Sequence, residues 1–163
     1  FYDFVDGPDY EEAKYRGNKT DYITEKEESP LDQIQVGQKV WLMANNKKYV
    51  CADQNRGETL IANSDNPWEW ETFILISNDN QKYSLYSSNK KYVSVDIEKN
   101  GEATAIRPKI GSWENFKLEY LDSNNVAILA SNGLYLSLDT ISLKIKASAI
   151  QIGENEKFQL IKE

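Results

Sequence analysis

The segment Asn46-Lys47-Lys48-Tyr49-Val50-Cys51-Ala52-Asp53 organises this 163-residue chain, because it recurs twice in recognisable form. The second copy is Asn89-Lys90-Lys91-Tyr92-Val93-Ser94-Val95-Asp96, and the third is Asn132-Gly133-Leu134-Tyr135-Leu136-Ser137-Leu138-Asp139. Successive tyrosines of the three copies are 43 residues apart. A constant period of this size indicates a repeat architecture, in which each unit buries its apolar face against its neighbours.

Each repeat contains four short stretches rich in β-branched and aromatic residues, separated by Asn, Asp, Gly and Lys, and this pattern predicts four strands. The predicted first strands are 40–42, 83–85 and 126–128, and the second strands are the Tyr-x-x-x-Asp segments. The third strands are 60–62, 103–105 and 143–145, and the fourth strands are 70–75, 113–118 and 156–160. Asn45-Asn46, Ser88-Asn89 and Asn132-Gly133 are predicted as tight turns between the first two strands of each repeat.

The period shortens once, because Phe73 and Phe116 are 43 residues apart but Phe116 and Phe158 only 42. The last repeat therefore lacks one residue in a loop. Apolar residues at equivalent positions are expected to meet near the threefold axis in one core. They are Leu42, Leu85, Ile128, Phe73, Phe116 and Phe158.

Three repeats of four strands predict an all-β fold, a β-trefoil over residues 37–163. A propeller normally has four or more blades, and an open array would expose sheet edges that aggregate. Residues 1–36 are predicted as a separate acidic, tyrosine-rich arm or linker, with a short helix from Pro8 through Tyr15. We expect its tyrosines to pack on the main domain or on a neighbouring domain.

The repeat also resembles a known family. The pattern Gly-Lys-Tyr-(Val/Leu)-x-(Ala/Val)-(Asp/Glu), followed by Trp-Glu-x-Phe-x-Leu, is similar to that of fascin-like β-trefoil domains. It is carried here by residues 48–53, 70–75 and 113–118, although the third repeat has Asn155 in place of the tryptophan. The resemblance implies a trefoil that serves as an actin-bundling module or as a carbohydrate-binding accessory module of a secreted glycoside hydrolase. The Gln-x-Trp signature of ricin-type lectins is absent, so their sugar sites do not transfer.

Composition excludes several classes of function. The chain has no histidine and one cysteine, Cys51, which removes a Ser-His-Asp site, a typical zinc site and an internal disulfide. Residues 1–35 hold ten carboxylates and four basic residues, and they supply most of the net charge of −7. No basic field for nucleic acid is present, and no apolar run is long enough for membrane insertion. Cofactors and metals are not expected.

The repeated Asp53, Asp96 and Asp139 have two interpretations. Each follows the second strand of its repeat, where aspartate commonly caps a turn by accepting a backbone N–H. Each could also offer a carboxylate to the hydroxyls of a sugar. Fold-determining positions repeat most faithfully, so the structural interpretation is favoured and the ligand-binding one is kept open.

Aromatic residues that break the repeat are better candidates for function, since the fold does not require them. Trp68 replaces Gly111 and Gly153, and we expect it to be exposed. A shallow sugar site is predicted around Trp68, Asp53, Asn55 and Asn66, with Asp96 and Asp139 as further candidates. Trp41 replaces Ser84 and Ala127 and is expected to dock the arm. Glu69 and Glu71 are expected on one face of a strand, without the raised pKa of a catalytic pair.

The predicted function is non-catalytic binding of a polysaccharide or glycan, outside the cell or at its surface. A catalytic domain, such as a glycoside hydrolase, is expected in the same parent protein, and Phe1 would follow either that domain or a cleaved leader. The alternative is a fascin-like actin-binding or other protein-interaction module, with a cytoplasmic location. The acidic pI of about 4.8 disfavours actin, which is itself acidic. A protease inhibitor or a receptor ligand is a third alternative.

Overall fold

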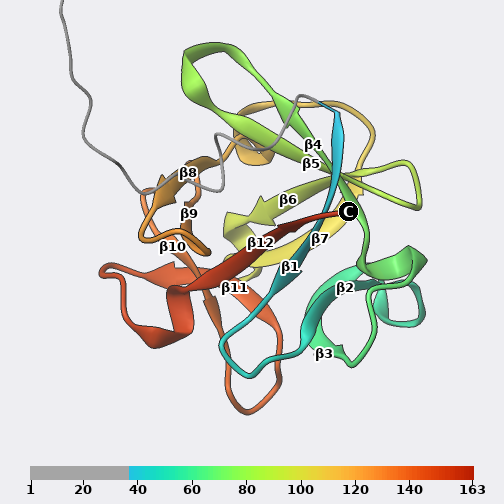
Figure 1. The fold of residues 1–163 in the computed structure, drawn as a ribbon. Coiled ribbons are helices and arrows are strands. Elements are labelled where there is room, and N and C mark those ends of the chain that lie inside the picture. Colours follow the sequence, from blue (N-terminus) through green and yellow to red (C-terminus); the bar gives the residue numbers. More distant parts are fainter. Residues whose placement is uncertain (1–36) are drawn as a thin grey trace, which may run out of the picture.

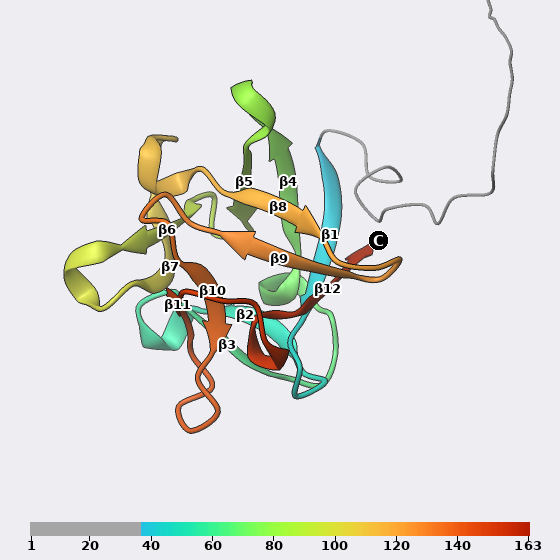
Figure 2. The same ribbon diagram turned by 90° about the vertical axis from the view of Figure 1, so that its left-hand side faces the viewer.

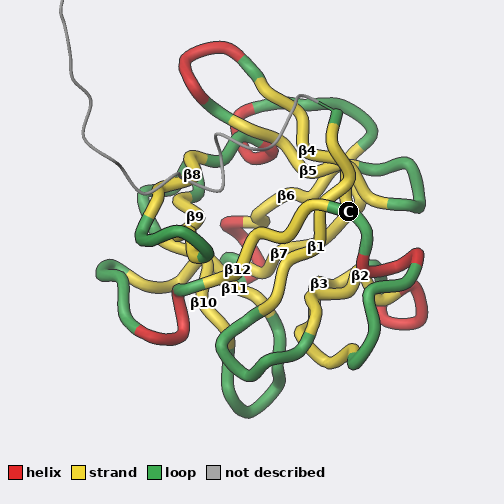
Figure 3. Tube along the Cα trace, in the orientation of Figure 1, coloured by secondary structure: helices red, strands yellow, loops and turns green. Residues whose placement is uncertain are grey.

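The computed structural model describes residues 37–163, which form twelve strands joined by turns and one-turn 3-10 helices (Figure 1). The strands are β1 (Gln38–Met43), β2 (Tyr49–Asp53), β3 (Thr59–Ser64), β4 (Phe73–Ser77), β5 (Tyr83–Ser87), β6 (Tyr92–Asp96), β7 (Glu102–Arg107), β8 (Lys117–Tyr120), β9 (Asn125–Leu129), β10 (Tyr135–Leu138), β11 (Ile145–Ala149) and β12 (Phe158–Lys162). The 3-10 helices are η2 (Gln54–Arg56), η3 (Glu69–Glu71), η4 (Asp79–Gln81), η5 (Ile97–Lys99), η6 (Ser112–Glu114) and η7 (Glu154–Glu156). Figure 3 shows these helices confined to the connections between strands.

Six strands close into a barrel. β1 pairs with β12 and β4, β4 pairs with β5, and β9 pairs with β8 and β12, all antiparallel. The remaining gap, between β5 and β8, is bridged by reciprocal backbone hydrogen bonds of 2.8 Å between Tyr83 and Phe116. Closure leaves no long unpaired edge in the barrel, which removes the aggregation hazard of an open sheet.

The other six strands form three hairpins, β2–β3, β6–β7 and β10–β11, which pair with one another through β3, β7 and β11. In Figure 2 the β4–β5 and β8–β9 pairs lie above the β2–β3 and β10–β11 hairpins. Three equivalent backbone bonds tie the hairpins together: Ala62 N to Leu143 O at 2.8 Å, Ala105 N to Glu58 O at 2.9 Å and Ala147 N to Gly101 O at 2.7 Å. Barrel and hairpins together give the β-trefoil that the sequence predicts.

The core is one cluster in which the repeat positions meet. Phe73, Phe116 and Phe158 are at most 1% exposed, and Leu42, Leu85 and Ile128 are also buried. The prediction of a shared core at these positions is confirmed. Burying a side chain of this size typically stabilises a fold by roughly 1.5–3 kcal/mol, so the repeated positions carry much of the stability.

Three details of the strand prediction are wrong. The Trp-Glu pairs that begin the predicted fourth strands belong to η3 and η6, because the glutamate caps the turn, and the strands begin after them. The third strand of the last repeat is Ile145–Ala149 rather than 143–145. The third hairpin turn is centred one residue earlier than predicted, since Gly133 N bonds Ala130 O.

The missing residue of the last repeat is located between Asp139 and Leu143. The turns Asp53–Glu58 and Asp96–Gly101 close with equivalent backbone bonds of 2.9 and 3.0 Å, whereas Asp139–Leu143 closes with one of 2.7 Å and is one residue shorter. The shorter turn forms no 3-10 helix and displaces the following strand in the sequence. The predicted arm and its helix lie outside the described residues. Within residues 37–163 no helix combines the length and apolarity needed to cross a membrane.

Candidate binding groove beside Trp68

Trp68 projects into solvent from a backbone that is firmly held. Its N–H donates to Glu71 Oε1 at 2.9 Å, and Ser64 Oγ donates to Glu71 Oε2 at 2.8 Å. Glu71 is 6% exposed, whereas Trp68 is 72% exposed. Trp68 is thus exposed, as expected, with its backbone fixed by a buried carboxylate that caps η3.

The same cap recurs in the other repeats, with glycine in place of Trp68. Gly111 N donates to Glu114 Oε1 at 2.6 Å, and Gly153 N donates to Glu156 Oε1 at 2.7 Å. The three backbones are extended, with φ of −94°, −124° and −118°. None of these angles demands glycine, so the indole is an addition that the fold accepts without needing it.

Trp68 forms one wall of a surface groove of about 570 Å³, which we call the Trp68 groove. Most of its lining comes from the connection between β3 and β4 and from β5 and its turn into β6. The groove is lined by Lys39, Pro67, Trp68, Glu69, Thr72, Ile74, Tyr86, Ser87, Ser88, Lys90 and Glu163. Its aromatic and aliphatic surface lies among hydroxyl and charged groups, a combination typical of sites for small organic ligands.

Two further rings, those of Tyr92 and Trp41, contact residues that line this groove. Tyr86 packs on Tyr92, with ring centroids 4.9 Å apart. Trp41 Nε1 donates to Thr72 Oγ1 at 3.1 Å, and Thr72 Oγ1 donates to Trp68 O at 2.7 Å. Trp41 is therefore tied to the Trp68 backbone, while its predicted contact with the arm involves residues outside the described part of the chain.

The pseudo-threefold symmetry generates equivalent grooves at the other repeat junctions. A groove of about 160 Å³, the Met43 groove, is lined by Met43, Ala44, Asn45, Lys47, Asn125, Glu154, Lys157 and Gln159. In register these eight positions correspond to eight that line the Trp68 groove. A third groove of about 530 Å³ is lined by Ser77, Asn78, Asp79, Asn80, Lys82, Ile110 and Asn115, and three of these are equivalent to Lys39, Pro67 and Thr72.

Three departures from the repeat line the Trp68 groove. At three positions, one repeat carries a residue that differs in kind from its two counterparts. These are Trp68 against Gly111 and Gly153, Tyr86 against Met43 and Leu129, and Ser87 against Ala44 and Ala130. All three line the same groove, although they come from segments about twenty residues apart. The other two repeats form the same fold without these residues, so the fold does not require them.

The structure does not bring all of the predicted sugar ligands together. In the β2–β3 hairpin Tyr49 pairs with Ser64, and Asp53 pairs with Thr59. Asp53 and Asn55 therefore lie at the far end of the hairpin from Trp68, roughly 13 Å along a five-residue strand. Asn66 is a neighbour of Trp68, with its carbonyl 3.1 Å from Trp68 N, but does not line the groove.

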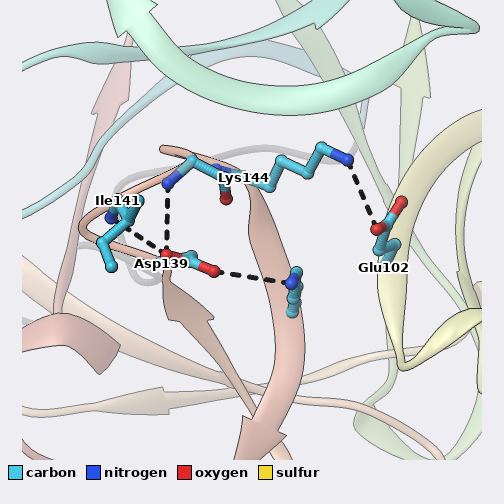
Figure 4. A network of polar contacts seen from close by, with 6 residues as sticks. Glu102, Asp139, Ile141 and Lys144 are labelled. Atoms are coloured by element: carbon cyan, nitrogen blue, oxygen red, sulfur yellow. Dashed lines mark hydrogen bonds and ion pairs between the residues drawn. The ribbon is translucent and has the colours of Figure 1, made fainter.

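The repeated aspartates cap turns. Asp53 Oδ1 accepts from Asn55 N and Asp96 Oδ1 accepts from Glu98 N, both at 3.0 Å. Asp139 Oδ1 accepts from Ile141 N at 2.9 Å and Ser142 N at 3.2 Å (Figure 4). These two N–H groups hold the pKa of Asp139 well below its usual range, at about 2. Ligand binding by the three aspartates stays a prediction, and they lie on hairpin turns away from the Trp68 groove.

An ion pair joins two of the hairpins near Asp139. Lys144 Nζ lies 3.4 Å from Glu102 Oε2, and Lys146 Nζ lies 3.4 Å from Asp139 Oδ2. Figure 4 shows the first contact crossing from the β10–β11 hairpin to β7. These groups are partly exposed, so each pair contributes little to stability and the region has the character of a structural surface.

Sequence reasoning missed the buried glutamates and the second wall of the groove. Glu69 and Glu71 do not share a strand face, since both are in η3 and Glu71 is committed to its cap. Glu71, Glu114 and Glu156 recur with the repeat, so their register could have revealed them. Tyr86 and Ser87 could have been found by the comparison that identified Trp68.

Cys51 is buried beside the same carboxylate. Burial, followed by a hydrogen bond with Glu71, raises the pKa of Cys51 to about 12. The thiol is therefore protonated at neutral pH and is a poor nucleophile or metal ligand. Within residues 37–163 no cluster of three or more His, Cys, Asp or Glu side chains is placed to hold a metal ion.

Comparison with known proteins gives a family and a fold. Residues 31–148 match the model of a family described as a domain of unknown function, DUF7910. The chain belongs to this family. No curated protein matches the sequence. The fold of this chain is similar to that of solved β-trefoil structures at low sequence identity.

Three such structures illustrate the likeness. The designed threefold-symmetric protein ThreeFoil has a TM-score of 0.68 and 15% identity, with 76% of this chain and 97% of that one covered. SeviL bound to asialo-GM1 saccharide has a TM-score of 0.63 and 17% identity, with 78% and 98% covered. An endo-β-galactosidase from Clostridium perfringens that releases GlcNAcα1-4Gal has a TM-score of 0.68 and 8% identity, with 77% and 32% covered. At these identities the likeness establishes the fold alone.

Proposed function

We propose that residues 37–163 form a non-catalytic carbohydrate-binding domain that holds a neutral saccharide in the Trp68 groove. The observation that carries this proposal is the convergence of Trp68, Tyr86 and Ser87, three departures from the internal repeat, on one groove. A trefoil scaffold does not need these residues, and a binding site does.

The groove has the chemistry that sugars require. An indole exposed over 72% of its surface offers a flat apolar face for the C–H face of a pyranose ring. Thr72, Ser87 and Ser88 line the groove, and their hydroxyl groups are of the kind that exchanges hydrogen bonds with sugar hydroxyls. The site is shallow and open, which suits recognition of part of a chain.

Charge favours a neutral ligand over an anionic one. The groove is lined by two lysines, Lys39 and Lys90, and by two glutamates, Glu69 and Glu163. The formal charges cancel, so no local field attracts a uronate or sulfate group. The domain as a whole carries a slight negative charge, which would repel polyanions further.

Trp68→Ala tests the proposal. Wild type is first screened on a neutral glycan array and on insoluble β-glucans, with pectate as the anionic comparison. With the best binder, Trp68→Ala should weaken affinity at least tenfold, about 1.4 kcal/mol, while leaving the melting temperature nearly unchanged. Ile141→Ala is the control, because Ile141 is 94% exposed on another hairpin. Absence of binding to every saccharide, or full affinity in Trp68→Ala, would refute the proposal.

The proposal also covers the parent protein to which this domain belongs. The C. perfringens endo-β-galactosidase is similar to this chain over 32% of its own length, which supports a trefoil placed beside a catalytic domain. We therefore place this domain in a secreted or surface-attached carbohydrate-active protein, with its boundary near residue 37. Full-length sequence and secretion of a tagged parent protein would test this setting independently of Trp68.

A further inference from the structure

Ser87 is a buried polar residue whose hydroxyl has no hydrogen-bond partner among residues 37–163. The residue is 2% exposed, and its Oγ is buried without a donor or acceptor in reach. It lies at the end of β5 and lines the Trp68 groove. The adjacent Ser88 hydroxyl is also unpaired and also lines the groove.

The fold does not ask for a hydroxyl at this position. The equivalent residues Ala44 and Ala130 are 4% and 3% exposed, so a methyl group fills the same place in both other repeats. An unsatisfied buried hydroxyl typically costs roughly 1–3 kcal/mol, because its hydration is lost and nothing replaces it. Serine at this position is therefore expected to lower stability, and such residues are expected at functional sites.

We propose that Ser87 contacts the ligand in the Trp68 groove and helps to determine which saccharide is bound. This inference rests on the proposed function. The proposed contact requires that rotation about its single side-chain torsion turns the hydroxyl into the groove, where a sugar hydroxyl supplies the missing partner. The ligand is then held between the indole, which takes its C–H face, and the serine, which takes an equatorial hydroxyl.

The chain contains a matched control. Ser94 in β6 is 1% exposed, and its Oγ is likewise buried and unpaired, but it lines none of the three grooves. Replacing either serine by alanine removes a buried unsatisfied hydroxyl and nothing else. A purely structural role would give Ser87→Ala and Ser94→Ala the same effects.

The experiment measures thermal stability and affinity for the array-selected saccharide in both variants. Ser87→Ala should raise the melting temperature and weaken affinity about five- to tenfold, so its two effects have opposite signs. Ser94→Ala should raise the melting temperature and leave affinity within twofold of wild type.

The outcomes separate this inference from the proposed function. If Trp68→Ala loses binding while Ser87→Ala keeps wild-type affinity, the role of Ser87 is overturned and the groove stands. If Ser87→Ala lowers both stability and affinity, Ser87 acts through the fold and the inference is again overturned. If Trp68→Ala binds as wild type does, or wild type binds no saccharide, both proposals fail.

Discussion

The Trp68 groove and the Met43 groove share one backbone frame and differ in the side chains that line it. In both, a buried glutamate caps the 3-10 turn. A lysine in the turn between the first two strands of a repeat, Lys90 or Lys47, lines each groove. The Trp68 groove adds an indole, a phenol and a hydroxyl where the Met43 groove has glycine, methionine and alanine. Their volumes are about 570 and 160 Å³.

The difference shows how a repeated fold acquires a single site. Residues that repeat faithfully maintain the frame, and those that depart from the repeat give one junction its chemistry. The Met43 groove can therefore serve as an internal control for the Trp68 groove. The same substitution can be made at equivalent positions of both grooves, and only the Trp68 groove is proposed to bind the ligand. Variants made in pairs separate effects on the frame from effects on binding.

The largest effect is expected from the buried glutamates. Glu71→Ala removes the buried carboxylate that accepts from Trp68 N–H and Ser64 Oγ, and Glu156→Ala removes the one that accepts from Gly153 N–H and Ser137 Oγ. Each variant should lose about 3 kcal/mol of the free energy of unfolding, measured by urea denaturation.

Affinity separates the two glutamate variants. Below the unfolding transition, Glu71→Ala should also weaken saccharide binding, because Trp68 loses its anchor, whereas Glu156→Ala should bind as wild type does. Equal loss of affinity in both would show that binding is not confined to the Trp68 groove.

A smaller, stabilising effect is expected when glycine replaces either of two lysines in the left-handed backbone conformation. Lys47 and Lys90 have φ of 66° and 68°, and the equivalent Gly133 has φ of 82°. A left-handed conformation costs an L-residue roughly 1–2 kcal/mol relative to glycine, which is offset in part by the entropy that glycine loses on folding. Lys47→Gly and Lys90→Gly should each stabilise the protein by about 1 kcal/mol.

Saccharide affinity is expected to distinguish Lys47→Gly from Lys90→Gly. Lys90 lines the Trp68 groove and Lys47 lines the Met43 groove, so affinity should fall two- to fivefold in Lys90→Gly alone. Isothermal titration of both variants and wild type measures this directly. If Lys47→Gly lost affinity as well, the difference between the two grooves would not hold.

Much of the frame could be predicted from sequence, because repetition marks the positions that the fold needs. The core phenylalanines and the 43-residue units were found in this way, and Trp68 was found as a departure. The site predicted around Trp68 includes Asp53, which lies at the other end of a hairpin, so ligand binding by both residues together stays a prediction. The groove is formed by residues of two repeats. Tyr86 comes from the second repeat, and nothing in the sequence around Trp68 indicates that the two residues line one groove. The sequence predicts the Trp-Glu pairs as strand residues, because alternation of apolar and polar residues does not distinguish a strand from a turn capped by a carboxylate.

The smallest effect should appear in the turns of the β2–β3 and β10–β11 hairpins, where the first and third repeats also differ. The turn after Asp53 gives its carboxylate one backbone N–H, and the shorter turn after Asp139 gives two. The pKa of Asp139 is lowered to about 2. Because the folded pKa lies below the ordinary value, ionised Asp139 stabilises the fold above about pH 4, and this contribution is lost as the pH falls toward 2.

Asp139→Asn tests this titration, since asparagine keeps an oxygen that can accept both N–H groups but carries no charge. The variant should be slightly less stable than wild type at pH 7, and the difference in urea midpoint should shrink between pH 4 and pH 2.5. Saccharide affinity should not change, because Asp139 lies away from the Trp68 groove. A loss of affinity at constant stability would instead assign Asp139 to a ligand site, and the grooves would no longer account for binding by themselves.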